Sequence, residues 1–326
     1  MSLLMPVGSL QTASTARAAH FRRDRTRLGR RADALFAGAT ALAGLLVLLT
    51  LGYMVLATTT TALPVFRAQG LAFVTSSTWQ PDRGVFGILA FIYGTLVTSV
   101  IALVIAVPLS LGVSLYLTEA APRWLRGPLA YAVDLLAAVP SVIYGLWGVF
   151  VLLPLFLQPA ADLLSRVFGF LPLFAGPASG ISYFGAGVVL AIMIVPIISS
   201  LCREVFRAVP MDDRHAAYAL GATRWEMIRG AVLPRSRAGI VGAVMLGLGR
   251  ALGETIAVAL LIGSKVDVSA SVVRPGYSMA AVIANQFQEA TGDHIRALVG
   301  VGVVLFAITI VINAAARLLV WRMVER

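Results

Sequence analysis

Long apolar runs separated by short polar segments make up most of this chain. Each run is long enough to cross a hydrocarbon core of ~30 Å, which takes about 20 helical residues. We expect the runs near 34–61, 86–117, 128–157, 181–204, 238–262 and 295–320. The pattern predicts an all-α integral membrane protein with six transmembrane helices.

The polar segments divide the chain into a tail, a membrane domain and one long loop. Residues 1–31 are rich in Arg, Ala, Ser and Thr, so we expect a disordered cytoplasmic tail there. Residues 32–326 form the predicted six-helix domain, with a loop at 205–237. The first apolar run is too long for a signal peptide, and no small-residue cleavage site follows it, so we interpret it as an uncleaved anchor.

Composition and charge agree with a membrane location and add an orientation. The 326 residues are 59% hydrophobic and 13% charged, which exceeds the apolar content that one soluble core of this length could bury. The basic side chains behind the net charge of +11 lie between the apolar runs and not on one polar face, so they do not indicate a nucleic-acid-binding protein. Most Lys and Arg lie in alternate segments that include both ends, which predicts cytoplasmic termini.

The loop at 205–237 has the local signals of a helix-turn-helix. An acidic pair suits the start of a first helix, and Gly221 is the residue type that ends a helix most easily. Thr223 and Glu226 have the spacing of a capping box for a second helix, which we expect to run to Pro234. Small Ala and Gly side chains would let another protein approach closely. A basic amphipathic hairpin on the membrane surface is the alternative interpretation.

Two charges lie inside the fifth apolar run, in the stretch "GLGRALGETIAV". Arg250 is about 20 Å and Glu254 about 25 Å from the cytoplasmic edge at a rise of 1.5 Å per residue. A charge at such depth costs roughly 2.5–3.5 kcal/mol, so it indicates a function. At positions i and i+4 the two share a helix face and can pair. They form either a static buried ion pair or part of an anion path, in which Glu254 keeps the empty site from trapping the anion.

Other residues in the runs have simpler interpretations. Pro140 and Pro196 predict kinks, which suit gating but are common in membrane helices. Glycines in the fifth run predict close helix packing, at positions 242, 247, 249 and 253. Asp134 is expected to be hydrated near the interface. The three histidines are far apart and Cys202 is the single cysteine, so we expect no metal site and no intramolecular disulfide.

The loop sequence "HAAYALGATRWEMIRGAVLP" resembles the EAA loop of ATP-binding-cassette (ABC) importer permeases. Ala216, Ala217, Gly221, Leu233 and Pro234 match the pattern, while His215 replaces the usual Glu. The resemblance implies that the loop docks in a groove of a separate ATPase subunit. The expected coupling residues are His215, Ala216, Ala217, Gly221, Thr223, Glu226, Leu233 and Pro234.

Four further stretches resemble the PstC family of phosphate importer permeases: 86–119, 138–150, 247–264 and 279–290. This resemblance implies a type I ABC importer transmembrane domain in the inner membrane, with Arg250 and Glu254 on the phosphate path. It implies a PstA-like second permease, a PstB-like ATPase dimer and a PstS-like binding protein. The chain's single lysine, Lys265, lacks P-loop spacing, so we expect no cofactor in this chain and place ATP and Mg²⁺ in the partner ATPase.

Several alternatives remain open at this point. Sulfate, molybdate or phosphonate could replace phosphate as the substrate, and a homodimer could replace the heterodimer. An ATP-independent anion carrier would need no docking loop, and the chain shows no clear inverted repeat of the kind such carriers often have. A membrane scaffold or sensor would not need charges in mid-membrane.

Overall fold

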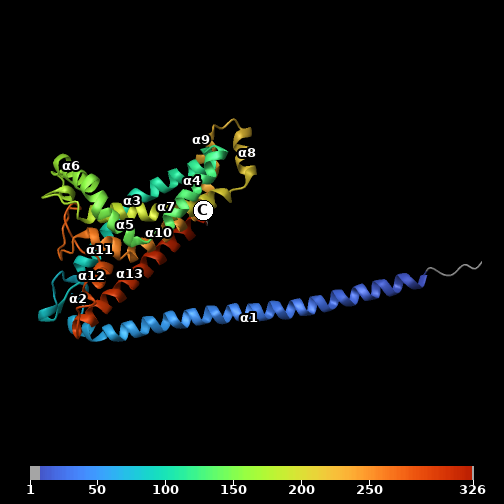
Figure 1. Ribbon diagram of the computed structural model, residues 1–326, viewed down its shortest axis with the longest axis horizontal. Coiled ribbons are helices and arrows are strands. Elements are labelled where there is room, and N and C mark those ends of the chain that lie inside the picture. The colour runs from blue at the N-terminus through green and yellow to red at the C-terminus, as the bar shows by residue number, and fades with distance from the viewer. Residues whose placement is uncertain (1–7, 325–326) are drawn as a thin grey trace, which may run out of the picture. The chain divides into compact units, whose positions relative to one another are not determined.

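The computed structural model describes residues 8–324, with the side chains of residues 32–318 (Figure 1). Two compact units result, Met1–Ala57 and Thr58–Arg326. The first unit contains most of helix α1 (Gly8–Gln69), which is exposed along its described part up to residue 54. We expected disorder over 1–31, but the backbone is helical from Gly8, since Ala and Arg are strong helix formers. Residues 1–7 of this predicted tail lie outside the described residues.

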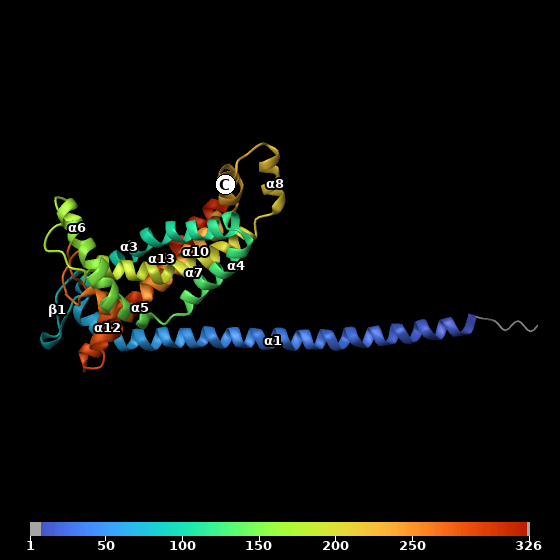
Figure 2. The same ribbon diagram turned by 45° about the horizontal axis from the view of Figure 1, so that its top comes forward.

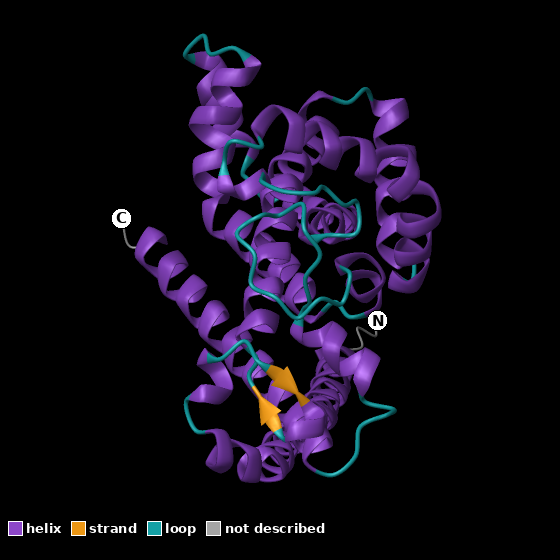
Figure 3. Cartoon of the chain, turned by 90° about the vertical axis from the view of Figure 1, so that its left-hand side faces the viewer, coloured by secondary structure: helices purple, strands orange, loops and turns teal. Residues whose placement is uncertain are grey.

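The first half of the second unit begins with short elements and continues into long helices. A small antiparallel hairpin pairs Trp79 with Phe86. The hairpin lies next to loops at one end of the bundle (Figure 3). The elements are α2 (Ala72–Thr75), β1 (Trp79–Gln80), η1 (Pro81–Arg83), β2 (Val85–Phe86), α3 (Leu89–Leu115), η2 (Tyr116–Ala120), α4 (Arg123–Ala138), α5 (Ser141–Trp147), η3 (Gly148–Leu157), α6 (Gln158–Phe168) and η4 (Pro172–Phe174).

The second half contains the central helix of the bundle. Helix α7 buries the largest share of its length, and it packs against α3, α4, α10 and α11 (Figure 2). The elements are α7 (Tyr183–Arg207), α8 (Met211–Ala219), α9 (Arg224–Met227), η5 (Ile228–Val232), α10 (Leu233–Gly253), α11 (Ile256–Ile262), α12 (Met279–Gln286) and α13 (Asp293–Val324).

Six helical segments of the described chain are long and apolar enough to cross a membrane, which confirms the predicted number. They are Ala32–Gln69, Leu89–Ala120, Ser141–Phe168, Tyr183–Arg207, Arg224–Gly253 and Asp293–Leu318. Helices are the expected elements here because a lipid-exposed backbone must satisfy its own hydrogen bonds.

The third span differs from the predicted run at 128–157. The helix stops at Ala138 because the residue before a proline avoids the helical region, and Val139 has an extended backbone with ψ 128°. Pro140 then precedes α5, and the third span starts at Ser141 and continues to Phe168 through η3. Pro140 therefore separates two helices where we expected a kink within one.

The fifth span differs from the predicted run at 238–262 in two ways. It starts earlier, because the second helix of the loop does not stop at Pro234 but continues through η5 into α10. It ends earlier, because Glu254 adopts an extended backbone with φ −70° and ψ 127°. A separate helix, α11, follows from Ile256.

Candidate functional site

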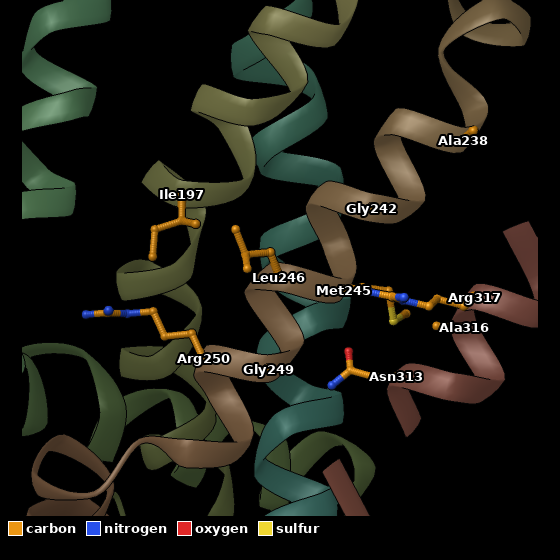
Figure 4. Close-up of a pocket in the computed structure, with 10 residues that line it drawn as sticks. All are labelled: Ile197, Ala238, Gly242, Met245, Leu246, Gly249, Arg250, Asn313, Ala316 and Arg317. Atoms are coloured by element: carbon orange, nitrogen blue, oxygen red, sulfur yellow. The ribbon is translucent and has the colours of Figure 1, made fainter. Parts of the chain in front are cut away.

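A cavity of about 870 Å³ opens between α7, α10 and α13 (Figure 4). Helix α7 contributes Ile197, and the other lining residues come from α10 and α13. They are Ala238, Gly242, Met245, Leu246, Gly249, Arg250, Asn313, Ala316 and Arg317. The wall is therefore mostly apolar, with three polar side chains.

The three polar side chains give the cavity a positive character. Arg250 and Arg317 are exposed, and neither forms an ion pair with a described side chain. The Asn313 amide donates to the Thr309 carbonyl at 2.9 Å. The Arg317 side chain extends from α13 toward Met245, while Arg250 extends from α10 away from Asn313 (Figure 4). Among the described residues no carboxylate lines this cavity, so an anion would meet two guanidinium groups.

Arg250 and Glu254 do not share a helix face, so our prediction of a shared face is wrong, and the alternative of a static ion pair between them is not supported. Helix α10 ends at Gly253, and the extended backbone of Glu254 turns its side chain off the helical repeat. Within the described residues the two side chains form no ion pair. Glu254 is only 9% exposed, and its Oε1 accepts from the Ala257 amide at 3.4 Å, so it contacts the start of α11.

Helix α10 packs closely on α7 just before the break. At Gly247, an added Cβ would lie 2.6 Å from the Ile198 side chain, so α10 and α7 approach closely there. Gly242 and Gly249 have no such neighbour and line the cavity. The close packing that we expected of these glycines thus holds for Gly247. Tyr144 lies within electrostatic range of Arg250, and its hydroxyl donates to the Leu136 carbonyl at 2.8 Å, across the break between α4 and α5.

The loop after α7 is the predicted helix-turn-helix. Helix α8 ends at Ala219, and Gly221 has φ +84°, a left-handed conformation that a side chain disfavours. The Thr223 amide donates to Glu226 Oε2 at 2.7 Å, and the Glu226 amide donates to Thr223 Oγ1 at 3.4 Å. Both halves of the capping box are therefore present.

The structure keeps the two predicted groups of residues apart. Helices α8 and α9 lie at one end of the bundle, away from α11 and α12 (Figure 1). His215, Ala216, Gly221, Thr223, Glu226 and Pro234 are exposed, while Ala217 and Leu233 are half-buried. The helical path from α9 through η5 to α10 joins this end to the cavity.

Two polar residues of the cavity wall, Asn313 and Arg317, were not predicted from the sequence. Their spacing of four residues on one predicted helix, i and i+4, was the available signal.

Comparison with known proteins agrees with this architecture. Residues 109–325 match the family described as "Binding-protein-dependent transport system inner membrane component". The fold and the family match thus define a multi-pass inner-membrane permease, which is not the ATPase and works with an ATPase and a binding protein. The chain belongs to the PstC family of phosphate transport system permeases, as two relatives show.

These relatives cover most of the chain. PstC of Xylella fastidiosa (strain 9a5c) is 49% identical over 78% of this chain and 80% of its own length. PstC of Mesorhizobium japonicum is 44% identical over 90% of this chain and 91% of its own. A chain of a bacterial alginate ABC transporter, crystallised with its alginate-bound periplasmic protein, has TM-score 0.55 and 18% identity, and covers 84% of this chain and 92% of its own. At that identity the likeness concerns the fold alone.

Proposed function

We propose that this chain carries inorganic phosphate through the inner membrane as one subunit of an ATP-driven importer. The observation that carries the proposal is the cavity wall, which presents Arg250 and Arg317 without a carboxylate. Guanidinium groups offer planar forks of donors that match the oxygens of phosphate. The names of the PstC relatives indicate the same substrate.

Within this proposal, Arg250 contacts the substrate and Glu254 shapes the path beside it. Glu254 contacts the start of α11 and is buried, so its charge lies next to the path without neutralising Arg250. A nearby carboxylate would lower the affinity for an anion and favour its release. Both residues therefore belong to the proposed substrate path, although their side chains form no ion pair.

The exposed loop is proposed as the site where the ATPase docks. The coupling residues are His215, Ala216, Ala217, Gly221, Thr223, Glu226, Leu233 and Pro234. Closure of a PstB-like ATPase dimer on ATP would move this loop, while a PstS-like protein delivers phosphate on the opposite side. A PstA-like subunit would complete the path. This arrangement requires both termini to lie in the cytoplasm.

The test is import of radioactive phosphate into proteoliposomes that contain the complete importer. We expect import that requires ATP and the binding protein, and that excess sulfate, molybdate or phosphonate does not suppress. Import without ATP would support the carrier alternative instead. Preferred import of another oxyanion would overturn the assignment of phosphate.

A further inference from the structure

The Arg214 side chain of α8 is buried at the base of the coupling loop. Its Nη1 donates to the Val209 carbonyl at 2.7 Å, and its Nη2 donates to the Phe206 carbonyl at 2.7 Å. Phe206 lies in the last turn of α7, where carbonyl groups lack partners within the helix. A cation at this end also suits the helix dipole. Arg214 therefore connects α8 to the end of α7 through hydrogen bonds.

The same guanidinium reaches a second span. Its Nη2 lies 3.0 Å from Glu119 Oε1 in η2, which continues α3 at its end. The two side chains are only 9% and 10% exposed, so water screens this pair weakly. They are 95 positions apart in sequence, so the contact joins distant elements. Removal of one partner would leave the other charge buried and unpaired.

Helices α3 and α7 already behave as one packed pair. Ser110 Oγ donates to the Val195 carbonyl at 3.2 Å, and Ser114 Oγ donates to the Ser199 carbonyl at 2.9 Å. Arg214 therefore connects α8 to a pair of helices that are bonded to each other. The other end of the loop continues as helix into α10.

We infer that Arg214 and Glu119 are positioning residues that make α8 move together with the α3–α7 pair. A push on the loop then shifts α10 relative to α7, which changes the cavity between Ile197 and Arg250. The inference rests on the proposed docking of the ATPase at this loop. The proposed docking does not specify which helices move with the loop or which side chains connect them to it.

A surface ion pair at the end of α7 supplies the control. Arg207 and Glu204 are 2.9 Å apart and exposed, so this pair contributes little. Glu119→Gln and Glu204→Gln each remove one carboxylate charge with almost no change in size. Arg214→Lys is a second variant, which keeps the charge but cannot reach both carbonyls and Glu119 at once.

The first experiment measures movement and does not depend on the substrate. Spin labels at Asp212→Cys on α8 and Leu109→Cys on α3, in a Cys202→Ala background, report one distance in the assembled importer. For the labelled protein without a further substitution, and for Glu204→Gln, we expect a narrow distance distribution. This distribution should be the same with and without ATP plus vanadate. Glu119→Gln and Arg214→Lys should broaden or shift it. An unchanged distribution in both variants overturns the inference.

The second experiment measures phosphate imported per ATP hydrolysed in proteoliposomes. Glu119→Gln should lower this ratio at least about fivefold, at the lower end of typical coupling energies, while ATP hydrolysis continues. A role in folding alone would lower both rates together and leave the ratio unchanged, which would overturn the inference. Hydrolysis without phosphate import by the unmodified importer would instead refute the proposed substrate, and the distance measurement would still decide the inference.

Discussion

Arg250 is the residue on which the proposed phosphate path depends most directly. Arg250→Lys keeps the positive charge but loses the planar fork of donors. Loss of one charge-assisted hydrogen bond costs about 1.5–3 kcal/mol, so we expect roughly a tenfold to hundredfold lower phosphate uptake, close to that of Arg250→Ala. Uptake is measured in cells without other phosphate carriers and normalised to inserted protein.

Arg317→Lys is the comparison variant, because it makes the same change on the same cavity wall. If Arg250→Lys restores most of the uptake that Arg250→Ala loses, a point charge is sufficient there. The fork-like contact with the substrate would then be refuted.

Two glycines of α10 separate the contribution of packing from that of the cavity. An added methyl group at Gly247 would meet Ile198, whereas one at Gly242 has no neighbour within 4 Å among the described residues. We expect Gly247→Ala to destabilise the chain by about 1–3 kcal/mol through overpacking. Gly242→Ala should be neutral or slightly stabilising, because alanine favours the helix. Thermal unfolding of both variants in one detergent provides the measurement, and equal stabilities would contradict the assignment.

The arrangement of the candidate site residues could not be predicted from local sequence. Arg250 and Glu254 could be singled out because a charge inside an apolar run has a high free-energy cost in the membrane. Their pairing was inferred from an uninterrupted helix, and the backbone of Glu254 breaks that helix. Arg214 and Glu119 meet only after folding, so no local spacing could reveal their contact.

At the scale of elements, the turn between α8 and α9 depends on the left-handed backbone of Gly221. Asn and Leu are similar in size, but only Asn adopts this conformation readily. Gly221→Leu should therefore weaken association with the ATPase and reduce uptake, at a strain of about 1–2 kcal/mol, while Gly221→Asn retains much of both. Co-purification of the ATPase with each variant provides the measurement.

The two Gly221 variants also test where the ATPase surface lies. In the described part of the chain no atom lies within 4 Å of a Cβ added at Gly221, so bulk alone does not disturb the loop. Failure of both variants would show that the partner's surface excludes any side chain. Normal association and uptake by both would refute the role of this turn in coupling.

Elements with local signals were the easiest to predict. Gly221 and the capping box of Thr223 and Glu226 act within four residues, and the structure has both. The break at Pro140 was harder, because hydrophobicity continues on both sides of it. The extension of the third span to Phe168 was also harder to predict, because α6 contains the polar residues Gln158, Asp162 and Arg166.

At the scale of the whole molecule, the single native cysteine permits a direct test of orientation. Cys202 is 0% exposed, whereas Leu220 in the loop and Leu71 after α1 are 90% and 85% exposed. A membrane-impermeant thiol reagent outside sealed cells should label Leu71→Cys and not Leu220→Cys. Inside-out vesicles should show the reverse, and labelling of Leu220→Cys from outside would contradict cytoplasmic termini. The unmodified chain controls for Cys202.

The number of spans could be predicted because it depends on length and composition. The arrangement of the helices could not, since every span presents apolar side chains and lipid is as apolar as a neighbouring helix. Helix α7 packs closely on α3, where the Ser110 and Ser114 hydroxyls donate to the Val195 and Ser199 carbonyls of α7. Such contacts appear only when both helices are in place.

The interruption between α10 and α11 has a consequence for how the membrane stays sealed. A continuous helix hides its peptide groups from hydrocarbon, but a break at Glu254 exposes some of them, and only water or protein can satisfy these groups. The Thr255 hydroxyl donates to the Gly253 carbonyl at 3.2 Å, and the Ala257 amide donates to Glu254 Oε1 at 3.4 Å, so side chains at the break satisfy two of these groups. The seal of the membrane at this depth therefore depends on these side-chain contacts.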